Sequence, residues 1–311
     1  MSALFETSKG SIPLPAFLPV TTFGGKHPLD DLVRHYLNRL SPAIMVSRYY
    51  AENMEPQPCP VFIDSGGFAS LFEGSQVVHL PDGTHGIQSR EGSLVTPASV
   101  LELQEKRAEI GATLDFIIPP KSSPEERKKL QDWTIQNAKW AFKNRTRKDF
   151  YLFASLQAWD QRSMERTLRP LQEIPFDGFA LGGMVPRIRT PNVIFELVKA
   201  FRKREPTRPL HIFGVGAPSL VKALFEHGVN SVDSSNYVRQ AASKRYFLPA
   251  KGTYVELNGR ISPSNECSCP VCQQFSQDYL SLEGELNKMA LALHNLAATI
   301  AYLEIDKAHG T

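Results

Sequence analysis

The sequence has little that would place this protein in a membrane. Its longest apolar run falls well short of the roughly 18 residues that a membrane helix needs. The N-terminal segment MSALFETSKGSIPLP lacks the apolar core of a secretory signal peptide. Internal repeats, low-complexity tracts and long linkers are missing as well. We therefore expect a globular, cytoplasmic protein that makes no membrane contact.

Excess charge of one sign is also missing. The net charge is only +3 and the pI is about 8.6, while 42% of the residues are hydrophobic and 22% are charged. This mildly basic balance permits a nucleic-acid partner without requiring one. The 311 residues exceed the usual size of one domain, but a single α/β barrel can reach this length.

Cysteine is rare, and three of the four cysteines stand together. Cys267, Cys269 and Cys272 lie in CSCPVCQQF, which suits a metal better than disulfides in a reducing compartment. The isolated Cys59 is expected to be a small core residue.

A helical pattern over residues 273–305 supplies a candidate fourth ligand, His294. Three thiolates and one imidazole would make a closed tetrahedral zinc site of the structural kind. The alternative is that His294 is simply packed on the apolar side of the helix. That side is formed by residues recurring at threes and fours, namely Tyr279, Leu282, Leu286, Met289, Leu293 and Leu296.

Short apolar runs alternate with segments of helical pattern along most of the chain. Several of these segments begin with Thr or Ser followed by Pro, a helix-start signal. The alternation predicts an irregular (β/α)₈ barrel. The irregularity is expected between the second and third strands, where RYYAENMEPQP is too rich in proline for a good helix. The eight predicted strands are AFLPV, AIMVS, VFID, DFIIP, FYLFASLQ, GFALGG, LHIFGVG and NSVDSS.

Acids, an amide and glycines mark the ends of most predicted strands. Asp64 follows VFI and precedes Ser65 and two glycines. One interpretation is that its side chain only caps the next turn. In a (β/α)₈ barrel, however, the working groups gather at the carboxyl ends of the strands. The set suits a planar polar ligand with many hydrogen-bonding edges. Its other members are Asp115, Gln157, Gly182, Gly183, Gly214, Gly216 and Asp233.

These motifs in order resemble the tRNA-guanine transglycosylase family over nearly the whole chain. They are DSGGF, Asp115, SLQ, ALGGM, FGVGAP, VDSSNY and the Cys-x-Cys-x-x-Cys cluster with a later His. The resemblance implies a barrel over residues 1–250, and a structural zinc subdomain with a long helix over 251–311. It also implies exchange of a guanine in a nucleic acid for a 7-deazaguanine base.

The resemblance implies a role for each site residue. Asp233 is expected to be the nucleophile that attacks the ribose C1′, and Asp64 the general acid/base. The base is expected to stack between Phe68 and Phe213, with Asp115 accepting hydrogen bonds from its N1-H and amino group. The other predicted contacts to the base come from Ser65, Gly66, Gln157, Gly182 and Gly183.

Departures from the bacterial pattern resemble the archaeal branch and the related DNA-modifying enzymes. The segment GGMVPRIRT lacks the Glu that follows the glycine pair in bacterial enzymes, which favours 7-cyano-7-deazaguanine (preQ0) over an aminomethyl base. The chain also stops soon after the zinc helix, whereas archaeal tRNA enzymes carry further RNA-binding domains. We therefore expect DNA as the substrate, with tRNA as the alternative.

Two rival classes stay open, a non-catalytic partner subunit and an unrelated zinc-containing nucleic-acid-binding barrel. Retention of both Asp64 and Asp233 favours chemistry over either. The sequence does not decide whether a homodimer forms or whether helper proteins open the strand. The residues expected to contact phosphates, because they follow predicted strand ends, are Arg187, Arg189, Arg239, Lys244 and Arg245.

Overall fold

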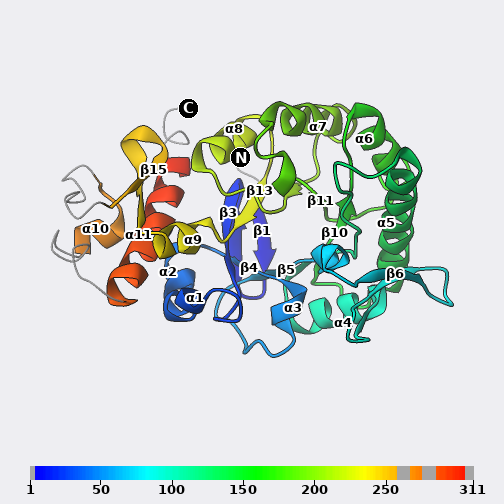
Figure 1. The fold of residues 1–311 in the computed structure, drawn as a ribbon, viewed down its shortest axis with the longest axis horizontal. Helices are drawn as coiled ribbons and strands as arrows, with labels where there is room; N and C mark the ends of the chain where they lie inside the picture. The colour runs from blue at the N-terminus through cyan, green and yellow to red at the C-terminus, as the bar shows by residue number, and fades with distance from the viewer. Residues whose placement is uncertain (1–3, 258–266, 275–284, 305–311) are drawn as a thin grey trace.

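A computed structural model describes residues 4–257, 267–274 and 285–304. Its centre is a closed barrel of eight parallel strands, paired in chain order with the last strand returning to the first (Figure 1). The predicted (β/α)₈ barrel is confirmed. The barrel strands are β3 (Ala16–Thr21), β4 (Ile44–Val46), β5 (Val61–Ile63), β9 (Ile110–Ala112), β10 (Tyr151–Leu156), β11 (Gly178–Leu181), β12 (Leu210–Ile212) and β13 (Ser231–Ser234).

The helices lie outside the strands and begin where the sequence signals them. The side chain of Thr96 accepts from Ser99 N at 3.0 Å before α4, and Ser123 accepts from Glu126 N at 3.1 Å before α5. Between β4 and β5 there is only a single turn, α3, as the proline-rich segment predicts. The helices around the barrel are α1 (Pro28–Val33), α2 (Leu37–Leu40), α3 (Arg48–Ala51), α4 (Pro97–Arg107), α5 (Pro124–Asn144), α6 (Gln161–Leu168), α7 (Pro191–Arg204), α8 (Pro218–Glu226) and α9 (Asn236–Ala242).

The fourth barrel strand differs from the prediction. The expected strand DFIIP is an extended loop, and β9 is instead the short run Ile110–Ala112, which lies just after α4. Pro119 and Pro120 lack an N–H for the ladder, so the chain cannot continue a strand there. Asp115 consequently lies three residues beyond β9 rather than at the start of a strand. Helices α6 and α9 and the small sheet of β6 (Gln76–His79), β7 (His85–Gln88) and β8 (Leu94–Val95) were not predicted.

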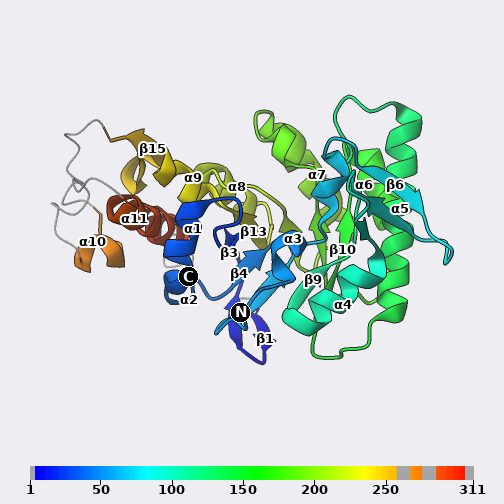
Figure 2. The ribbon, with the colours of Figure 1, turned by 60° about the horizontal axis from the view of Figure 1, so that its bottom comes forward.

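An N-terminal hairpin closes the end of the barrel at which the strands begin. Its strands are β1 (Leu4–Thr7) and β2 (Gly10–Pro13), and β1 lies beneath β3 and β4 in Figure 2. Phe5 and Ile12 from the hairpin pack in one apolar cluster with Leu18, Phe62 and Phe153 from the barrel strands. The opposite end, where the strands finish, is left for polar side chains.

The C-terminal helix α11 (Glu285–Glu304) completes the outer ring. It packs against α8, α9 and α1, so it lies between the last and the first parts of the barrel (Figure 1). Leu293 and Leu296 are buried in the main core, as the helical pattern predicts. The predicted helix positions Tyr279 and Leu282 lie outside the described residues.

A second hairpin, β14 (Arg245–Leu248) with β15 (Thr253–Glu256), connects the barrel to the cysteine segment. It spans residue 250, and the division of the chain at that residue stays a prediction. The short helix α10 (Pro270–Gln274) follows. In the described part of the chain, no helix has the length and apolarity to cross a membrane.

A fully buried amide, that of Asn295, attaches α11 to its neighbours. Its Oδ1 accepts from Phe247 N at 2.8 Å, and its Nδ2 donates to Arg245 O at 2.9 Å and to Tyr237 O at 3.4 Å. These three bonds join α11 to the β14 strand and to α9, and satisfy backbone groups that water cannot reach.

Asn295→Ala should lower the free energy of unfolding by about 2–4 kcal/mol, because it leaves buried backbone groups unpaired. Chemical denaturation of the whole chain measures this loss. Lys288→Ala, at a partly exposed position of the same helix, is the control and should change the value by less than about 0.5 kcal/mol. Equal stability of the two variants would show that Asn295 does not hold α11.

Candidate active site and metal centre

Asp64 follows β5 directly and is held by one of its two oxygens. Arg48 N donates to Oδ1 at 2.7 Å, Gly66 N at 2.9 Å and Ser47 Oγ at 3.2 Å. Burial raises the pKa of the Asp64 carboxyl to about 6, although the bonds from Arg48 and Gly66 lower it, and the charge of Asp233 raises it further. The carboxyl can therefore give or take a proton near neutral pH.

Asp233 lies on β13, and it is 7% exposed. Its Oδ1 accepts from Gly214 N at 2.9 Å and contacts His211 Nε2 at 3.1 Å. Because its charge acts on Asp64, the two acids that the sequence predicts as catalytic share one site. An ionised carboxylate of this kind is a suitable nucleophile for a sugar carbon.

Asp115 is buried beside Ser65, the neighbour of Asp64 in the chain, and uses both of its oxygens. Ser65 Oγ donates to Oδ1 at 2.5 Å, and Gln157 Nε2 donates to Oδ2 at 2.5 Å. Burial raises the pKa of Asp115, while these two hydrogen bonds lower it. The structure thus brings Ser65, Asp115 and Gln157 together in one network, and their contact with a base stays a prediction.

Two glycines are required by how closely the backbone approaches this network. A Cβ on Gly182 would overlap Gln157 Nε2 and lie 2.7 Å from Asp115 Oδ2. A Cβ on Gly67 would overlap Asp115 Oδ1 in the same way. Since no larger residue fits at either place, only glycine lets both backbones lie this close to Asp115.

The two predicted stacking residues differ in exposure. Phe213 is partly buried, with its ring centroid 4.7 Å from that of His211 and 6.2 Å from that of Phe62. Phe68 is 54% exposed on a helical turn at Gly67–Leu71, where its ring meets Phe72 edge-on. A base sandwiched between Phe68 and Phe213 stays a prediction.

The predicted phosphate contacts divide into an interior and an exposed group. Arg187 is buried and donates to the carbonyl oxygen of Gly183, and burial lowers the pKa of its guanidinium. Arg187 therefore holds the backbone at Gly183 from the interior of the protein. Arg189, Arg239 and Lys244 are exposed, whereas Arg245 is partly buried and donates to Tyr254 O at 3.4 Å. Contact of any of them with phosphate stays a prediction.

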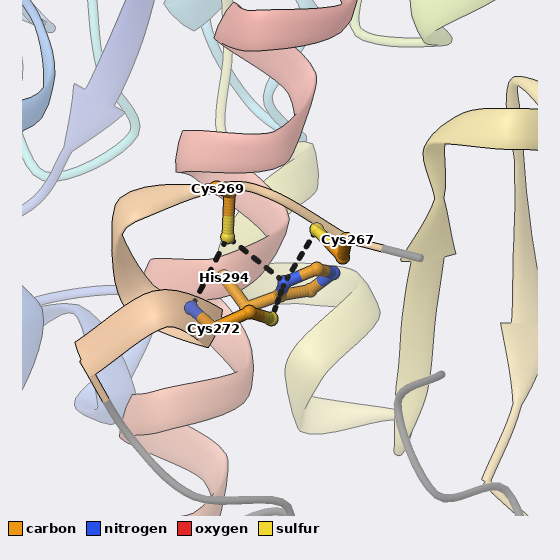
Figure 3. Close-up of side chains that lie close together, drawn as sticks. All are labelled: Cys267, Cys269, Cys272 and His294. Atoms are coloured by element: carbon orange, nitrogen blue, oxygen red, sulfur yellow. Dashed lines mark hydrogen bonds between the residues drawn. The ribbon is translucent and has the colours of Figure 1, made fainter. Parts of the chain in front are cut away.

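Cys267, Cys269, Cys272 and His294 form a second site, away from the carboxylates. Their ligand atoms all lie within 4.8 Å of one another, and the three sulfurs are 3.1–3.9 Å from His294 Nδ1. The cysteines come from the turn that begins α10 and the histidine from α11, and the four side chains converge (Figure 3). A tetrahedral zinc ion separates its ligand atoms by about 3.3–3.8 Å, so this donor set fits a metal.

The histidine of this cluster is oriented by its surroundings. Its Nε2 lies 2.9 Å from Phe247 O, and the ring of Tyr246 stacks on it with centroids 3.9 Å apart. A carbonyl can only accept, so the hydrogen is on Nε2 and the lone pair of Nδ1 points at the sulfurs. Burial lowers the pKa of His294, but bonds to the Cys267 and Cys269 sulfurs raise it to about 9. Those sulfurs thus favour a proton or a metal cation at Nδ1.

Sequence reasoning missed several residues that hold the two acids. Ser47 and the Arg48 backbone bind Asp64, while His211 and Ser231 stand beside Asp233. A signal for His211 exists in the sequence, because it interrupts the apolar run LHIF immediately before FGVG. Ser47 follows a predicted strand in the same way as Asp64 does, and carries no further signal.

Comparison with known protein families agrees with this geometry. A family model described as "TGT: Queuine tRNA-ribosyltransferase" matches residues 2–305. The chain belongs to this family. The match includes the barrel, both carboxylate positions and the Cys₃His cluster.

Individual relatives of the chain are archaeal proteins named tRNA-guanine(15) transglycosylase. The one from Pyrococcus furiosus is 26% identical over 298 residues, which cover 94% of this chain and 49% of the relative. The Methanococcus aeolicus protein is 24% identical over 93% of this chain and 45% of its own length. The Thermococcus onnurineus protein is 26% identical over 74% of this chain and 40% of its own length. The chain thus spans at most about half the length of these relatives.

The raised pKa of Asp64 predicts how Asp64→Asn changes stability with pH. An ionised Asp64 is less favourable in the folded state, so at pH 7 the neutral variant should be more stable by on the order of 2 kcal/mol. Asn keeps an Oδ1 for the three donors. The gain should shrink as the pH falls through 6 and vanish below about 4, where Asp64 is protonated whether folded or unfolded.

Melting temperatures at pH 7 and pH 4 test this. Asp82→Asn is the control, because a hydrogen bond from Thr84 lowers the pKa of Asp82. Its effect at pH 7 should therefore be a small loss of stability. An Asp64→Asn variant less stable than wild type at pH 7 would contradict the burial of this charge.

Proposed function

We propose that this protein exchanges a guanine in tRNA for a 7-deazaguanine base through a covalent intermediate on Asp233. The observation that supports it best is the pairing of two carboxylates with different surroundings. Asp233 is anchored by Gly214 N and His211, while burial raises the pKa of Asp64 to about 6 and the charge of Asp233 adds to that rise. One can serve as nucleophile while the other transfers protons.

In the first step a carboxylate oxygen of Asp233 bonds to C1′ as the C1′–N9 bond of guanine breaks. The electron pair of that bond leaves with N9, and the protonated Asp64 supplies the proton that makes guanine neutral. In the second step N9 of the incoming base attacks C1′ and loses its proton to Asp64, while the Asp233 carboxylate departs. Guanine leaves and the new base enters, with no net change in charge.

The network around Asp115 is suited to a guanine-like edge. Its carboxylate can accept from N1-H and the exocyclic amino group, with Ser65 and Gln157 changing partners as the base binds. Gln157 and the backbone at Gly182 and Gly183 would donate to the carbonyl side. Glycine at 67 and 182 allows the backbone to approach Asp115 and Gln157 this closely.

The relatives favour tRNA over DNA as the polymer. Both the family description and the names of the archaeal proteins refer to tRNA, while the expectation of DNA depended on the length of the chain and on departures from the bacterial pattern such as GGMVPRIRT. For the incoming base, Met184 follows the glycine pair and is fully buried. An apolar side chain there offers no partner to an aminomethyl cation, which supports a neutral base such as preQ0.

The Cys₃His cluster would hold a structural zinc ion. All four ligand positions are filled by protein, so no place is left for a reacting water. Its part would be to join α10 to α11, and through α11 to the barrel.

An adduct assay tests the proposed chemistry. Wild-type protein mixed with tRNA and no free base should form a covalent adduct that survives denaturing electrophoresis, and Asp233→Asn should form none, because an amide is a poor nucleophile. Asp64→Asn should slow exchange of labelled guanine by about 10²–10⁴-fold, the usual range for a general acid/base. Adduct formation by Asp233→Asn would remove Asp233 from this role.

The polymer is tested in parallel reactions that contain labelled guanine or preQ0. Bulk tRNA, single-stranded DNA and duplex DNA are offered separately, and incorporated label is counted. We expect label in tRNA. Label in DNA alone would overturn the tRNA assignment but keep the chemistry.

The zinc site predicts that Cys269→Ser releases the metal and unfolds the segment around α10, since binding and folding of such a site are coupled. Metal content by mass spectrometry and protease sensitivity measure the two effects. Cys59→Ser is the control, because this buried cysteine lies outside the cluster, and it should keep one metal per chain. A Cys269→Ser protein with full metal content would show that the cluster is not the zinc site.

A further inference from the structure

We propose that a buried chain, Ser231–His211–Asp233, selects which oxygen of Asp233 attacks the sugar. The proposal rests on the function proposed above and adds two positioning residues to it. His211 Nε2 lies 3.1 Å from Asp233 Oδ1, and His211 Nδ1 lies 2.9 Å from Ser231 Oγ. The imidazole therefore bridges a hydroxyl and the nucleophile, with no solvent exposure of its own.

The two strands create this arrangement through their register. β12 and β13 are parallel neighbours, and His211 pairs with Ser231 across the ladder. Ser231 and Asp233 are two residues apart on β13, so their side chains leave the same face of the strand. The ring is held between Phe62 and Phe213, with centroids 4.9 and 4.7 Å away. His211 thus has little freedom to turn.

The proton positions follow from the chemistry of the partners. An ionised carboxylate only accepts, so His211 must carry its hydrogen on Nε2. The bare Nδ1 then accepts from the hydroxyl of Ser231, which can donate by rotating. Ser231 in this way stabilises the one tautomer of His211 that can donate to Asp233.

Both donors to Asp233 meet the same oxygen. His211 Nε2 and Gly214 N both donate to Oδ1, whereas no described residue donates to Oδ2. Hydrogen bonds draw negative charge toward Oδ1, so Oδ2 is the oxygen free to bond to C1′. In the covalent intermediate Oδ1 becomes the ester carbonyl oxygen and keeps both donors. When the new base attacks, the C1′–Oδ2 bond breaks and the same donors stabilise the returning carboxylate.

Exchange kinetics of whole-chain variants test whether Ser231 and His211 select the attacking oxygen of Asp233. His211→Leu removes the donor and should lower kcat by about 10–100-fold with KM for tRNA unchanged within about twofold. His211→Gln places an amide N–H where Nε2 was, and its kcat should be at least tenfold higher than that of His211→Leu. Ser231→Ala should lower kcat by about 3–10-fold, the effect of one neutral hydrogen bond.

His85→Leu is the matched control, since it replaces another buried histidine, on β7, that contacts none of these residues. It should leave kcat unchanged even where it lowers the melting temperature. If His211→Leu and His85→Leu lose kcat equally, or if His211→Leu keeps the wild-type kcat, the proposal is overturned.

Nitrogen-15 NMR of the His211 ring gives a readout that needs no activity. Wild type should show the hydrogen on Nε2 and a bare Nδ1, and Ser231→Ala should add the Nδ1-H tautomer. A wild-type ring with its hydrogen on Nδ1 would refute the proposal. Absence of exchange by wild type on every polymer would instead refute the proposed function, and the NMR result separates these two failures.

Discussion

Keeping acidic groups ionisable inside a protein is the constraint on which the rest of this site depends. A buried carboxylate needs hydrogen-bond donors, but a close cation would neutralise the charge that the chemistry requires. The described donors to Asp64 and Asp115 are all uncharged, being backbone amides, hydroxyls and a carboxamide. In Asp64, as in Asp233, the donors converge on Oδ1. One oxygen of each acid is thereby fixed, and the other receives no hydrogen bond from the described residues.

The parallel barrel makes such anchoring possible because it aligns strand ends on one rim. Asp64, Asp115 and Asp233 come from segments far apart in the chain, yet their backbones are placed by neighbouring or facing strands. Backbone amides just beyond the strands, at Arg48 and Gly214, are free of the ladder and can bind carboxylates. The glycines near Asp115 then let the backbone approach that carboxylate closely.

Much of this could be predicted from sequence, because strand ends carry local signals. The acids and glycines that follow VFI and FAL, and the acid within SVDSS, were identifiable, and so was the Cys₃His set. The fourth strand was misplaced because Ile110–Ala112 is too short to show a period and directly follows a helical pattern. His211 interrupts an apolar run, but its contacts with Ser231 and Asp233 depend on a strand register that only the folded chain defines. The inward position of Arg187 likewise depends on the carbonyl it meets at Gly183.

Helix α11 has a consequence for how the chain is made. The strand that carries Asp233 leaves the ribosome well before α11, yet α11 supplies the packing between α8 and α1 and the imidazole of the cysteine cluster. All the groups of the active site are therefore synthesised before the ring that supports them can close. β13 can pair with β3 before α11 emerges, but the faces of α8 and α1 that α11 covers stay uncovered until then. Binding of a metal ion by all four side chains of the cysteine cluster would likewise have to wait for this helix.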